Sequence, residues 1–178
     1  MTEQTSSAQT GLESFTVRRA RTSDVRPIQR LVEPLVNTRI LLGKDAVNLY
    51  GDIQEFRIAD DDTGSPIGCG ALHVMWEDLG EVRTLAVARP WLKRGVGHAL
   101  LEELEADARK LGLTRVFCLT FETAFFARHG YEPMGEGTVD PAVYAELLRS
   151  TDEGVAEFLD LARVKPNTLG NTRMIKHL

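Results

Sequence analysis

A glycine turn between a strand-like run and a helical pattern carries the clearest chemical signal in the chain. Residues 92–98 (LKRGVGH) follow the apolar run 82–87 and precede a helical pattern over 96–111. The first N–H groups of a helix have no intrahelical partner, and the helix dipole is positive there. Because glycine lets an anion approach these groups closely, the pattern predicts a phosphate or pyrophosphate cradle, with a turn that binds nothing as the alternative. The candidate anion-binding residues are Lys93, Arg94, Gly95, Val96, Gly97 and His98.

Two other phosphate-binding motifs do not occur in the sequence. There is no Gly-x-x-x-x-Gly-Lys-Ser/Thr loop, which would cradle a nucleoside triphosphate. The third glycine of a dinucleotide-binding turn is also missing after Gly97. We therefore expect neither a nucleoside triphosphatase nor a dinucleotide-binding domain.

Strand-like and helix-like patterns surround this turn. Alternating or continuous apolar runs predict strands over 15–20, 55–59, 67–76, 81–87, 115–119 and 172–176, with a further strand starting at 130–131. Helical spacing of apolar residues predicts helices over 25–35, 41–50, 96–111, 123–129, 141–149 and 152–161. Residues 1–14 are polar and predict a disordered tail. No repeat or linker divides residues 15–178, which indicates a single α/β domain.

Composition limits the classes of partner. The net charge of −5 argues against binding to nucleic acid or to an anionic membrane. No apolar run is long enough to span a bilayer, and the first fourteen residues lack the core of a signal peptide, so we expect a cytoplasmic protein. Cys69 and Cys118 lie in apolar runs and indicate buried side chains rather than a disulfide or a metal site. The acidic run 60–62 lacks the rest of a calcium loop, and we expect no metal.

The order of these elements resembles the GCN5-related N-acetyltransferase (GNAT) superfamily. The resemblance covers about residues 15–134 and rests on the antiparallel strands before the turn, the turn itself, and the segment 124–131 (AFFARHGY). It implies the GNAT fold, in which helices flank a single mixed and mostly antiparallel central sheet. It also implies that acetyl-CoA is the co-substrate, with its pyrophosphate at the glycine turn. Backbone groups of Leu85 and Val87 would then contact its pantetheine arm and thioester.

Two positions depart from the family pattern. Leu92 stands where the family usually has Gln or Arg, which leaves the backbone cradle intact. Phe126 stands where the family often has a tyrosine that protonates the leaving thiolate. The general acid is therefore not assigned from the sequence.

A narrower resemblance concerns the acceptor. Residues 80–87 (GEVRTLAV) are similar to a strand of the bacterial N-acetylglutamate synthases, and 119–120, 125–131 and 170–174 resemble later segments of those enzymes. The whole chain is similar to the short amino-acid acetyltransferases of actinobacteria, which lack a kinase-like domain. This resemblance implies transfer of an acetyl group to the α-amine of L-glutamate or L-glutamine, the first step of arginine biosynthesis.

Acetyl transfer to an amine requires a base, because an α-ammonium group has a pKa of roughly 8 and is protonated at neutral pH. The resemblance places Glu81 in this role; an exposed carboxylate at a strand end is the alternative. The candidate acceptor-binding residues are Lys44, Arg83, Thr84, Thr120 and Arg173, although each cation taken alone is more often a surface charge. Gly170 stands where the larger synthases carry a substrate-binding arginine, which leaves the choice between glutamate and glutamine open.

Two other functions remain open at this stage. The domain could acetylate a peptide or another small amine, or it could bind acyl-CoA without catalysis as a regulatory domain. The expected partner is a small-molecule amino acid, with no nucleic acid and no membrane, and the superfamily resemblance is compatible with a homodimer.

Overall fold

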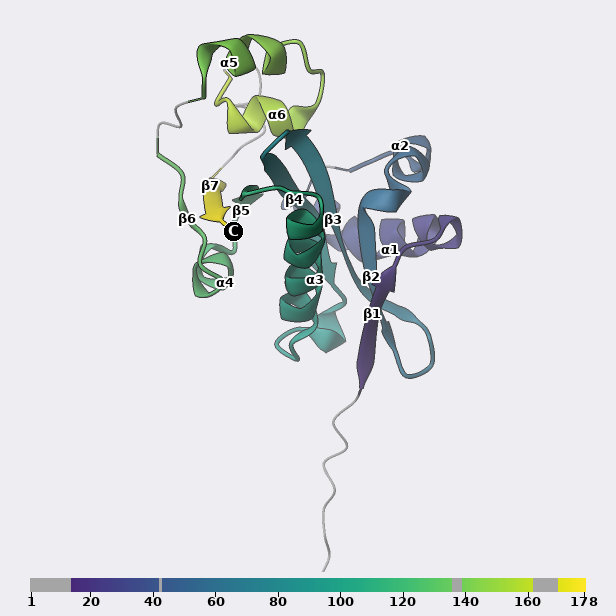
Figure 1. Ribbon diagram of the computed structural model, residues 1–178. Coiled ribbons are helices and arrows are strands. Elements are labelled where there is room, and N and C mark those ends of the chain that lie inside the picture. Colours follow the sequence, from purple (N-terminus) through teal and green to yellow (C-terminus); the bar gives the residue numbers. More distant parts are fainter. Residues whose placement is uncertain (1–13, 42, 136–138, 162–169) are drawn as a thin grey trace, which may run out of the picture.

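The computed structural model describes residues 14–41, 43–135, 139–161 and 170–178 (Figure 1). The tail was predicted over 1–14, and residues 1–13 of it lie outside this part of the chain. The strands within it are β1 (Phe15–Arg19), β2 (Phe56–Asp61), β3 (Pro66–Trp76), β4 (Leu79–Val87), β5 (Arg115–Thr120), β6 (Glu132–Pro133) and β7 (Thr172–His177). The α-helices are α1 (Val25–Asn37), α2 (Ala46–Gly51), α3 (Val96–Lys110), α4 (Thr123–Arg128), α5 (Pro141–Leu147) and α6 (Glu153–Phe158).

The strands form one mixed sheet in the order β1-β2-β3-β4-β5-β7-β6. The pair β4 and β5 is parallel and the other paired strands are antiparallel. Helix α3 makes the crossover that a parallel pair requires. The predicted fold class, a single mostly antiparallel sheet flanked by helices, is confirmed.

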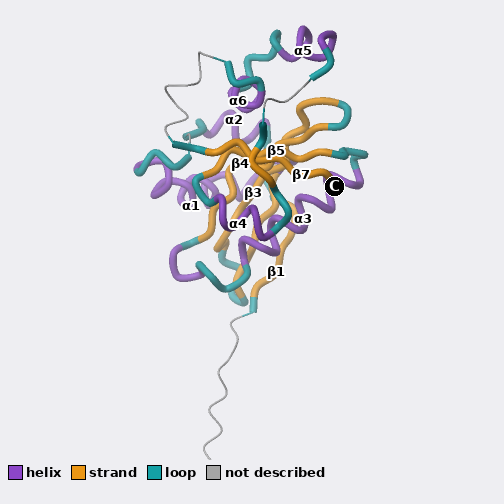
Figure 2. Tube along the Cα trace, turned by 90° about the vertical axis from the view of Figure 1, so that its left-hand side faces the viewer, coloured by secondary structure: helices purple, strands orange, loops and turns teal. Residues whose placement is uncertain are grey.

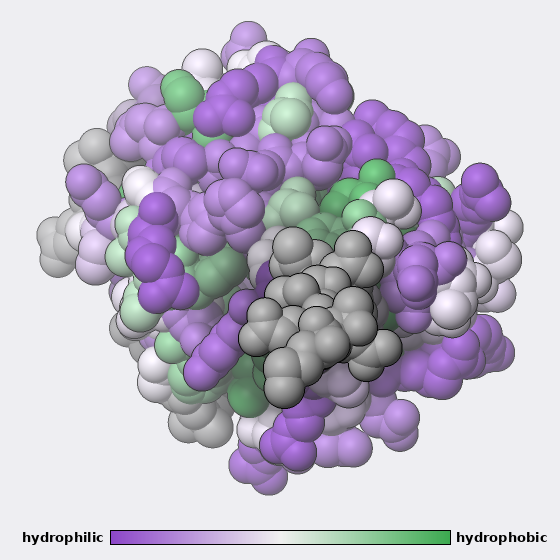
Figure 3. All heavy atoms as spheres, turned by 90° about the horizontal axis from the view of Figure 1, so that it is seen from below, coloured by the Kyte–Doolittle hydropathy of each residue, from purple (hydrophilic) through white to green (hydrophobic). Residues whose placement is uncertain are grey.

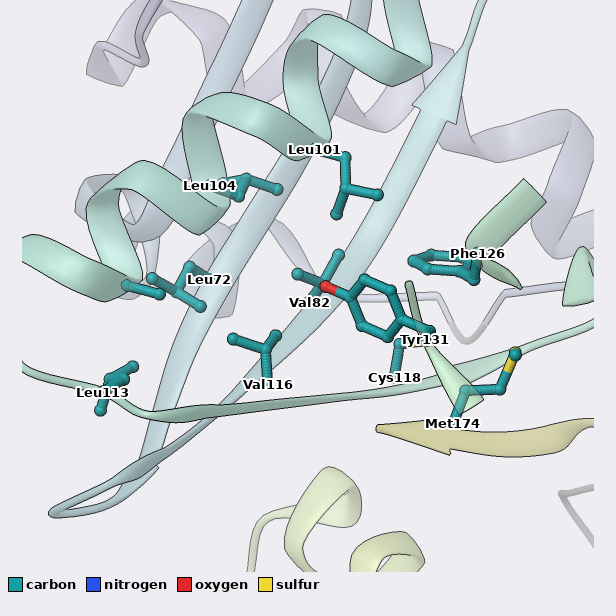
Figure 4. Close-up of a cluster of buried hydrophobic side chains, with 11 residues drawn as sticks. Leu72, Val82, Leu101, Leu104, Leu113, Val116, Cys118, Phe126, Tyr131 and Met174 are labelled. Carbon is teal, nitrogen blue, oxygen red and sulfur yellow. The ribbon is translucent and has the colours of Figure 1, made fainter. Parts of the chain in front are cut away.

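Helices cover both faces of this sheet. Helix α3 lies on one face and α1 on the other, as the ribbon shows (Figure 1). Leu101 and Leu104 of α3 are fully buried and point at Leu72, Val82 and Val116 of the sheet (Figure 4). Burial of a leucine side chain contributes about 2 kcal/mol, so this apolar layer fixes α3, and with it the glycine turn, against β3 and β4.

The segment α5–α6 lies beyond one end of the sheet in both backbone views (Figures 1 and 2). Phe158 of α6 meets Phe117 of β5 edge to face, with 5.5 Å between the ring centroids. Val155 and Leu147 belong to the same buried cluster. This apolar contact anchors α6 beside the middle strands.

Strand β4 contains an irregularity that shapes the site. The register with β3 shifts between Ala71↔Arg83 and Cys69↔Ala86, and Thr84 has a left-handed backbone with φ 58°. The pairs between β4 and β5 end at Glu81↔Phe117, although both strands continue. Beyond Glu81, β4 therefore keeps β3 on one edge while its other edge has no strand partner among the described residues, which leaves backbone N–H and C=O groups available.

The predicted and observed elements differ most at α2. A helix was expected over 41–50, but α2 begins at Ala46, because Asp45 before it has an extended backbone with ψ 151°. Lys44 consequently lies in a loop. None of the described helices is both long and apolar enough to cross a membrane. The face of the molecule in Figure 3 is mostly hydrophilic, with smaller apolar patches.

Candidate active site

A pocket of about 690 Å³ opens between the α1–α2 segment, strands β3 and β4, and α6. Four of the predicted site residues line it: Glu81, Arg83, Thr84 and Lys44. They come from two segments far apart in the sequence, and the sheet brings them together. The pocket is next to the part of β4 that has lost its β5 partner, so it adjoins the open strand edge.

Glu81 is a buried carboxylate in the lining of the pocket. It lies on β4 opposite His73 of β3, and only 6% of the residue is exposed. Burial raises the pKa of the Glu81 carboxyl because water no longer stabilises its charge, while the neighbouring Arg83 opposes this shift. A carboxylate with a raised pKa is a better proton acceptor, as a general base requires.

Arg83 bridges two carboxylates. Its Nε donates to Glu81 Oε2 at 2.9 Å, so the two side chains share a face of β4. Its Nη1 and Nη2 donate to Asp152 Oδ2 and Oδ1 at 3.0 and 2.8 Å. Although burial opposes its charge, the two carboxylates raise the pKa of Arg83. Burial alone would raise the pKa of Asp152, but the hydrogen bonds from Arg83 lower it to about 2.

His73 adds a further titratable group to the pocket wall. Its Nδ1 is 2.7 Å from Glu55 Oε1, and its Nε2 is 3.7 Å from Asp152 Oδ2. The hydrogen bond with Glu55 raises the pKa of His73, against the effect of burial. The imidazole therefore carries a positive charge to higher pH than a free histidine does.

Helix α6 closes over Glu81 through a glycine. A Cβ added at Gly154 would lie 2.0 Å from Glu81 Oε2 and 2.7 Å from Arg83 Nη2. Only a residue without a side chain lets the first turn of α6 approach the carboxylate this closely. Asp152 caps the same turn by accepting a hydrogen bond from Val155 N–H at 3.1 Å.

Glu157 of α6 lines the pocket from the same helix. It is 5% exposed, and burial raises the pKa of its carboxyl to about 7, with help from Glu153 and Glu81. The wall formed by α6 is therefore acidic. The α1–α2 segment contributes Arg39 and Lys44 to the lining, together with Asp52, which pairs with Lys44 Nζ at 2.9 Å.

Two other candidate acceptor-binding residues lie outside the lining of this pocket. Thr120 Oγ1 accepts a hydrogen bond from Glu122 N–H at 2.8 Å, where β5 ends. Arg173 donates to the carbonyl of Phe158 at 3.2 Å. Both side chains hold the backbone around the pocket, and their contact with the acceptor stays a prediction.

The predicted anion cradle has the geometry expected from the sequence. Gly95 is the N-cap of α3 with φ 86°, and no side chain caps the helix or places an acid in its first turn. A Cβ at Gly97 would contact the Phe125 ring at 3.6 Å, so α4 packs against this turn. His98 Nδ1 lies 2.6 Å from His129 Nε2, which joins the start of α3 to the end of α4.

The remaining candidates have defined surroundings. Lys93 has a left-handed backbone with φ 62° beside the cradle, and the guanidinium of Arg94 lies 5.4 Å from the centre of the Trp91 ring. Val96 is buried against the sheet at the start of α3, and it anchors the turn. Leu85 and Val87 lie on the open edge of β4 between the cradle and the pocket.

Sequence reasoning missed several residues of the pocket. Asp152, Gly154 and Glu157 were not predicted, because their position depends on α6 packing against β4. The sequence marked Asp152 only as the first residue of the helix predicted over 152–161, and an aspartate at a helix start is typical of an N-cap. Phe126, at the position of the family tyrosine, packs in the core against Tyr131, with 5.1 Å between the ring centroids.

Comparison with known proteins places the chain in a family. Residues 37–135 match the Acetyltransferase (GNAT) family. An amino-acid acetyltransferase of Mycobacterium tuberculosis is 54% identical over 161 residues, which cover 89% of this chain and 92% of that protein. The chain belongs to the GNAT family of acetyltransferases.

Solved structures of related proteins agree with this result. A crystal structure of a Mycobacterium tuberculosis protein in complex with CoA and the ligand NLQ has a TM-score of 0.87 at 53% identity, covering 92% of this chain and 99% of that one. The N-acetylglutamate synthase of Neisseria gonorrhoeae, complexed with coenzyme A and N-acetyl-glutamate, has a TM-score of 0.73 at 26% identity. That match covers 93% of this chain but 35% of the synthase.

The contact at Gly154 leads to a first prediction. Gly154→Ala should lower acetyl transfer by at least about 10-fold, because the new methyl group displaces the Glu81 carboxylate from its geometry. The Glu81 carboxylate and the Arg83 guanidinium, which the methyl group would meet, are ends of flexible side chains. The midpoint of urea unfolding should therefore change little. Gly51→Ala is the control, since a Cβ there meets nothing within 4 Å. Equal activity of the two variants would contradict the prediction that acetyl transfer needs the Glu81 carboxylate in this position.

Proposed function

We propose that this protein is an amino-acid N-acetyltransferase that transfers the acetyl group of acetyl-CoA to the α-amine of L-glutamate or L-glutamine. This reaction is the first step of arginine biosynthesis. The similarity to the amino-acid acetyltransferase and to the CoA-bound synthase described above supports the reaction class. The acceptor itself is inferred from the pocket.

The distribution of charge across the pocket carries this proposal. The α1–α2 segment presents Arg39 and Lys44, although Lys44 is paired with Asp52, and the α6 segment presents Asp152 and Glu157, with Glu81 on β4. A free amino acid has an ammonium group and a carboxylate on one carbon, so such a pocket orients it with the amine towards Glu81. A lysine side chain of a peptide has no carboxylate near its amine, so Arg39 and Lys44 would receive no carboxylate from such an acceptor.

The co-substrate has a continuous path to this pocket. The backbone N–H groups around Gly95 and Gly97 hold the pyrophosphate, where the helix dipole and Lys93 favour negative charge. The pantetheine arm follows the open edge of β4 and pairs with backbone groups of Leu85 and Val87. The thioester then lies near the bulge at Thr84, next to Glu81.

The chemistry follows from these positions. Glu81 accepts a proton from the ammonium group, directly or through a water molecule, and the free amine attacks the thioester carbonyl carbon. The new N–C bond forms, the C–S bond breaks, and CoA leaves as its thiolate. The nitrogen then loses its second proton to water, and the thiolate takes a proton from water. Backbone N–H groups near Leu85 stabilise the negative charge that develops on the carbonyl oxygen. Phe126 has no proton to donate to the thiolate.

The acceptor is tested by measuring free-thiol release from acetyl-CoA with L-glutamate, L-glutamine or a lysine-containing peptide. We expect release with at least one of the two amino acids and none above background with the peptide. Release with the peptide alone would transfer the assignment to protein acetylation. No release with any acceptor, despite binding of acetyl-CoA measured by calorimetry, would indicate a binding domain without catalysis.

The role of the base is tested with Glu81→Gln. Loss of a general base lowers turnover by about 10²- to 10⁴-fold, and we expect a deficit in this range near neutral pH. The wild-type rate should fall as the pH drops through the raised pKa of Glu81, because the protonated form accepts no proton. The variant depends on free amine alone, so its rate should rise about tenfold per pH unit until the amine is deprotonated.

Glu132→Gln is the matched control, since Glu132 is an exposed glutamate on β6. The control should keep the wild-type rate and pH profile. Binding of acetyl-CoA should persist in both variants. A Glu81→Gln enzyme with the wild-type rate and pH profile would exclude Glu81 as the base.

A further inference from the structure

Five charged side chains form a continuous ladder along the pocket, in the order Glu55, His73, Asp152, Arg83 and Glu81. Neighbours in the ladder alternate in sign when His73 is protonated, and they are 2.7, 3.7, 2.8 and 2.9 Å apart at the contacts given above. The ladder joins the start of β2 to β3, α6 and β4. The chemistry above assigns proton transfer to Glu81, and it gives the second carboxylate next to Arg83 no specific contact with the acceptor.

The two carboxylates beside Arg83 have different surroundings. The Glu81 side chain is 9% exposed and is covered by Gly154, whereas the Asp152 side chain is 26% exposed. The pKa of Asp152 is lowered to about 2, and the pKa of Glu81 is raised. Environments that separate two carboxylates in this way commonly give them different roles. Glu81 suits proton transfer, and Asp152 remains an anion throughout the working pH range.

The Asp152 carboxylate also has an acceptor position available. Its Oδ1 accepts hydrogen bonds from Arg83 Nη2 and from Val155 N–H. Its Oδ2 accepts one from Arg83 Nη1, and His73 Nε2 at 3.7 Å is too distant for another. A carboxylate oxygen accepts two hydrogen bonds, so within the described part of the chain Oδ2 has room for one more donor.

We propose that Asp152 binds the ammonium group of the acceptor through Oδ2 and, through Arg83, positions Glu81 to receive its proton. This inference rests on the proposed function, because it assumes an amino-acid acceptor in this pocket. Asp152 holds the positive charge of the incoming amine, and Glu81 removes one proton from it. Arg83 stays bound to both carboxylates and keeps them on the same side of the amine.

The charges around this pair determine the effect of pH. His73 lies near Asp152 on β3 and contacts Glu55 before β2. Glu153 and Glu157 lie on α6. Lys44 and Asp52 line the pocket from the α1–α2 segment and the residue after it. The negative charge of Asp152 raises the pKa of Glu81, and Arg83 lowers it. Loss of the Asp152 charge therefore lowers the pKa of Glu81, also because Arg83 then has a single carboxylate to bind. His73 keeps its main partner, Glu55.

The test is the variant Asp152→Asn in the thiol-release assay. Asparagine caps a helix as well as aspartate does, so α6 should stay in place. A hydrogen bond to a charged group contributes about 1.5–3 kcal/mol, so the KM for the amino acid should rise about 10- to 150-fold. The KM for acetyl-CoA should not change, and the acidic limb of the kcat profile should move to lower pH. Asp140→Asn is the matched control, because Asp140 caps α5 and does not line the pocket.

A competitive inhibitor separates this role from a structural one. The probe is an analogue of the acceptor amino acid in which hydrogen replaces the amine. This analogue is glutarate if the acceptor is glutamate, and the half-amide of glutarate if the acceptor is glutamine. It should bind the Asp152→Asn variant as tightly as the wild type or more tightly, because it has no ammonium group that could bind to Asp152. Equal weakening of probe and substrate, or an unchanged KM for the amino acid, would overturn the proposal. A wild-type enzyme that acetylates neither amino acid would instead overturn the proposed function, and this inference with it.

Discussion

The site depends on the separation of β4 from β5 beyond Glu81. A strand that loses its neighbour leaves backbone groups without partners, which is unfavourable unless water or a ligand satisfies them. The left-handed residue Thr84 and the register shift against β3 produce this separation locally. Along the chain, the buried carboxylate of Glu81 is followed by the open edge of β4 and then by the glycine turn. The co-substrate and the acceptor can meet where the sheet opens.

The ion pairs of Arg83 make the charges of Glu81 and Asp152 tolerable in the pocket. A carboxylate as enclosed as Glu81 would be costly alone, and Arg83 offsets that cost. Arg83 is also shared with Asp152, so its charge does not hold Glu81 fully ionised. Helix α6, which contributes Asp152 and Glu157, lies outside residues 37–135, the part that matches the family. The proposed acceptor pocket thus combines residues of the matched segment, such as Arg39 and Lys44, with residues of a segment that follows it.

The sequence predicted what depends on local pattern and on the family resemblance. The strand, the turn and α3 around Gly95 follow from spacing and glycine chemistry, and all three were found. Regular strand alternation would put Arg83 on the same face as Glu81, and the hydrogen bond between them shows that it lies there. The contact between Arg83 and Asp152 joins residues 69 apart in the chain, and no local pattern encodes it. The bulge at Thr84 interrupts alternation, so the directions of the side chains after it could not be predicted.

The most direct test of this account is a crystal structure of the protein with CoA and the acetylated amino acid. The account predicts that the pantetheine arm pairs with β4 at Leu85 and Val87, and that the pyrophosphate lies at the turn of Gly95 and Gly97. The acetylated nitrogen should face Glu81 and Asp152, with the carboxylates towards Lys44. A pantetheine arm outside the gap between β4 and β5, or a product with its carboxylates towards α6, would contradict it.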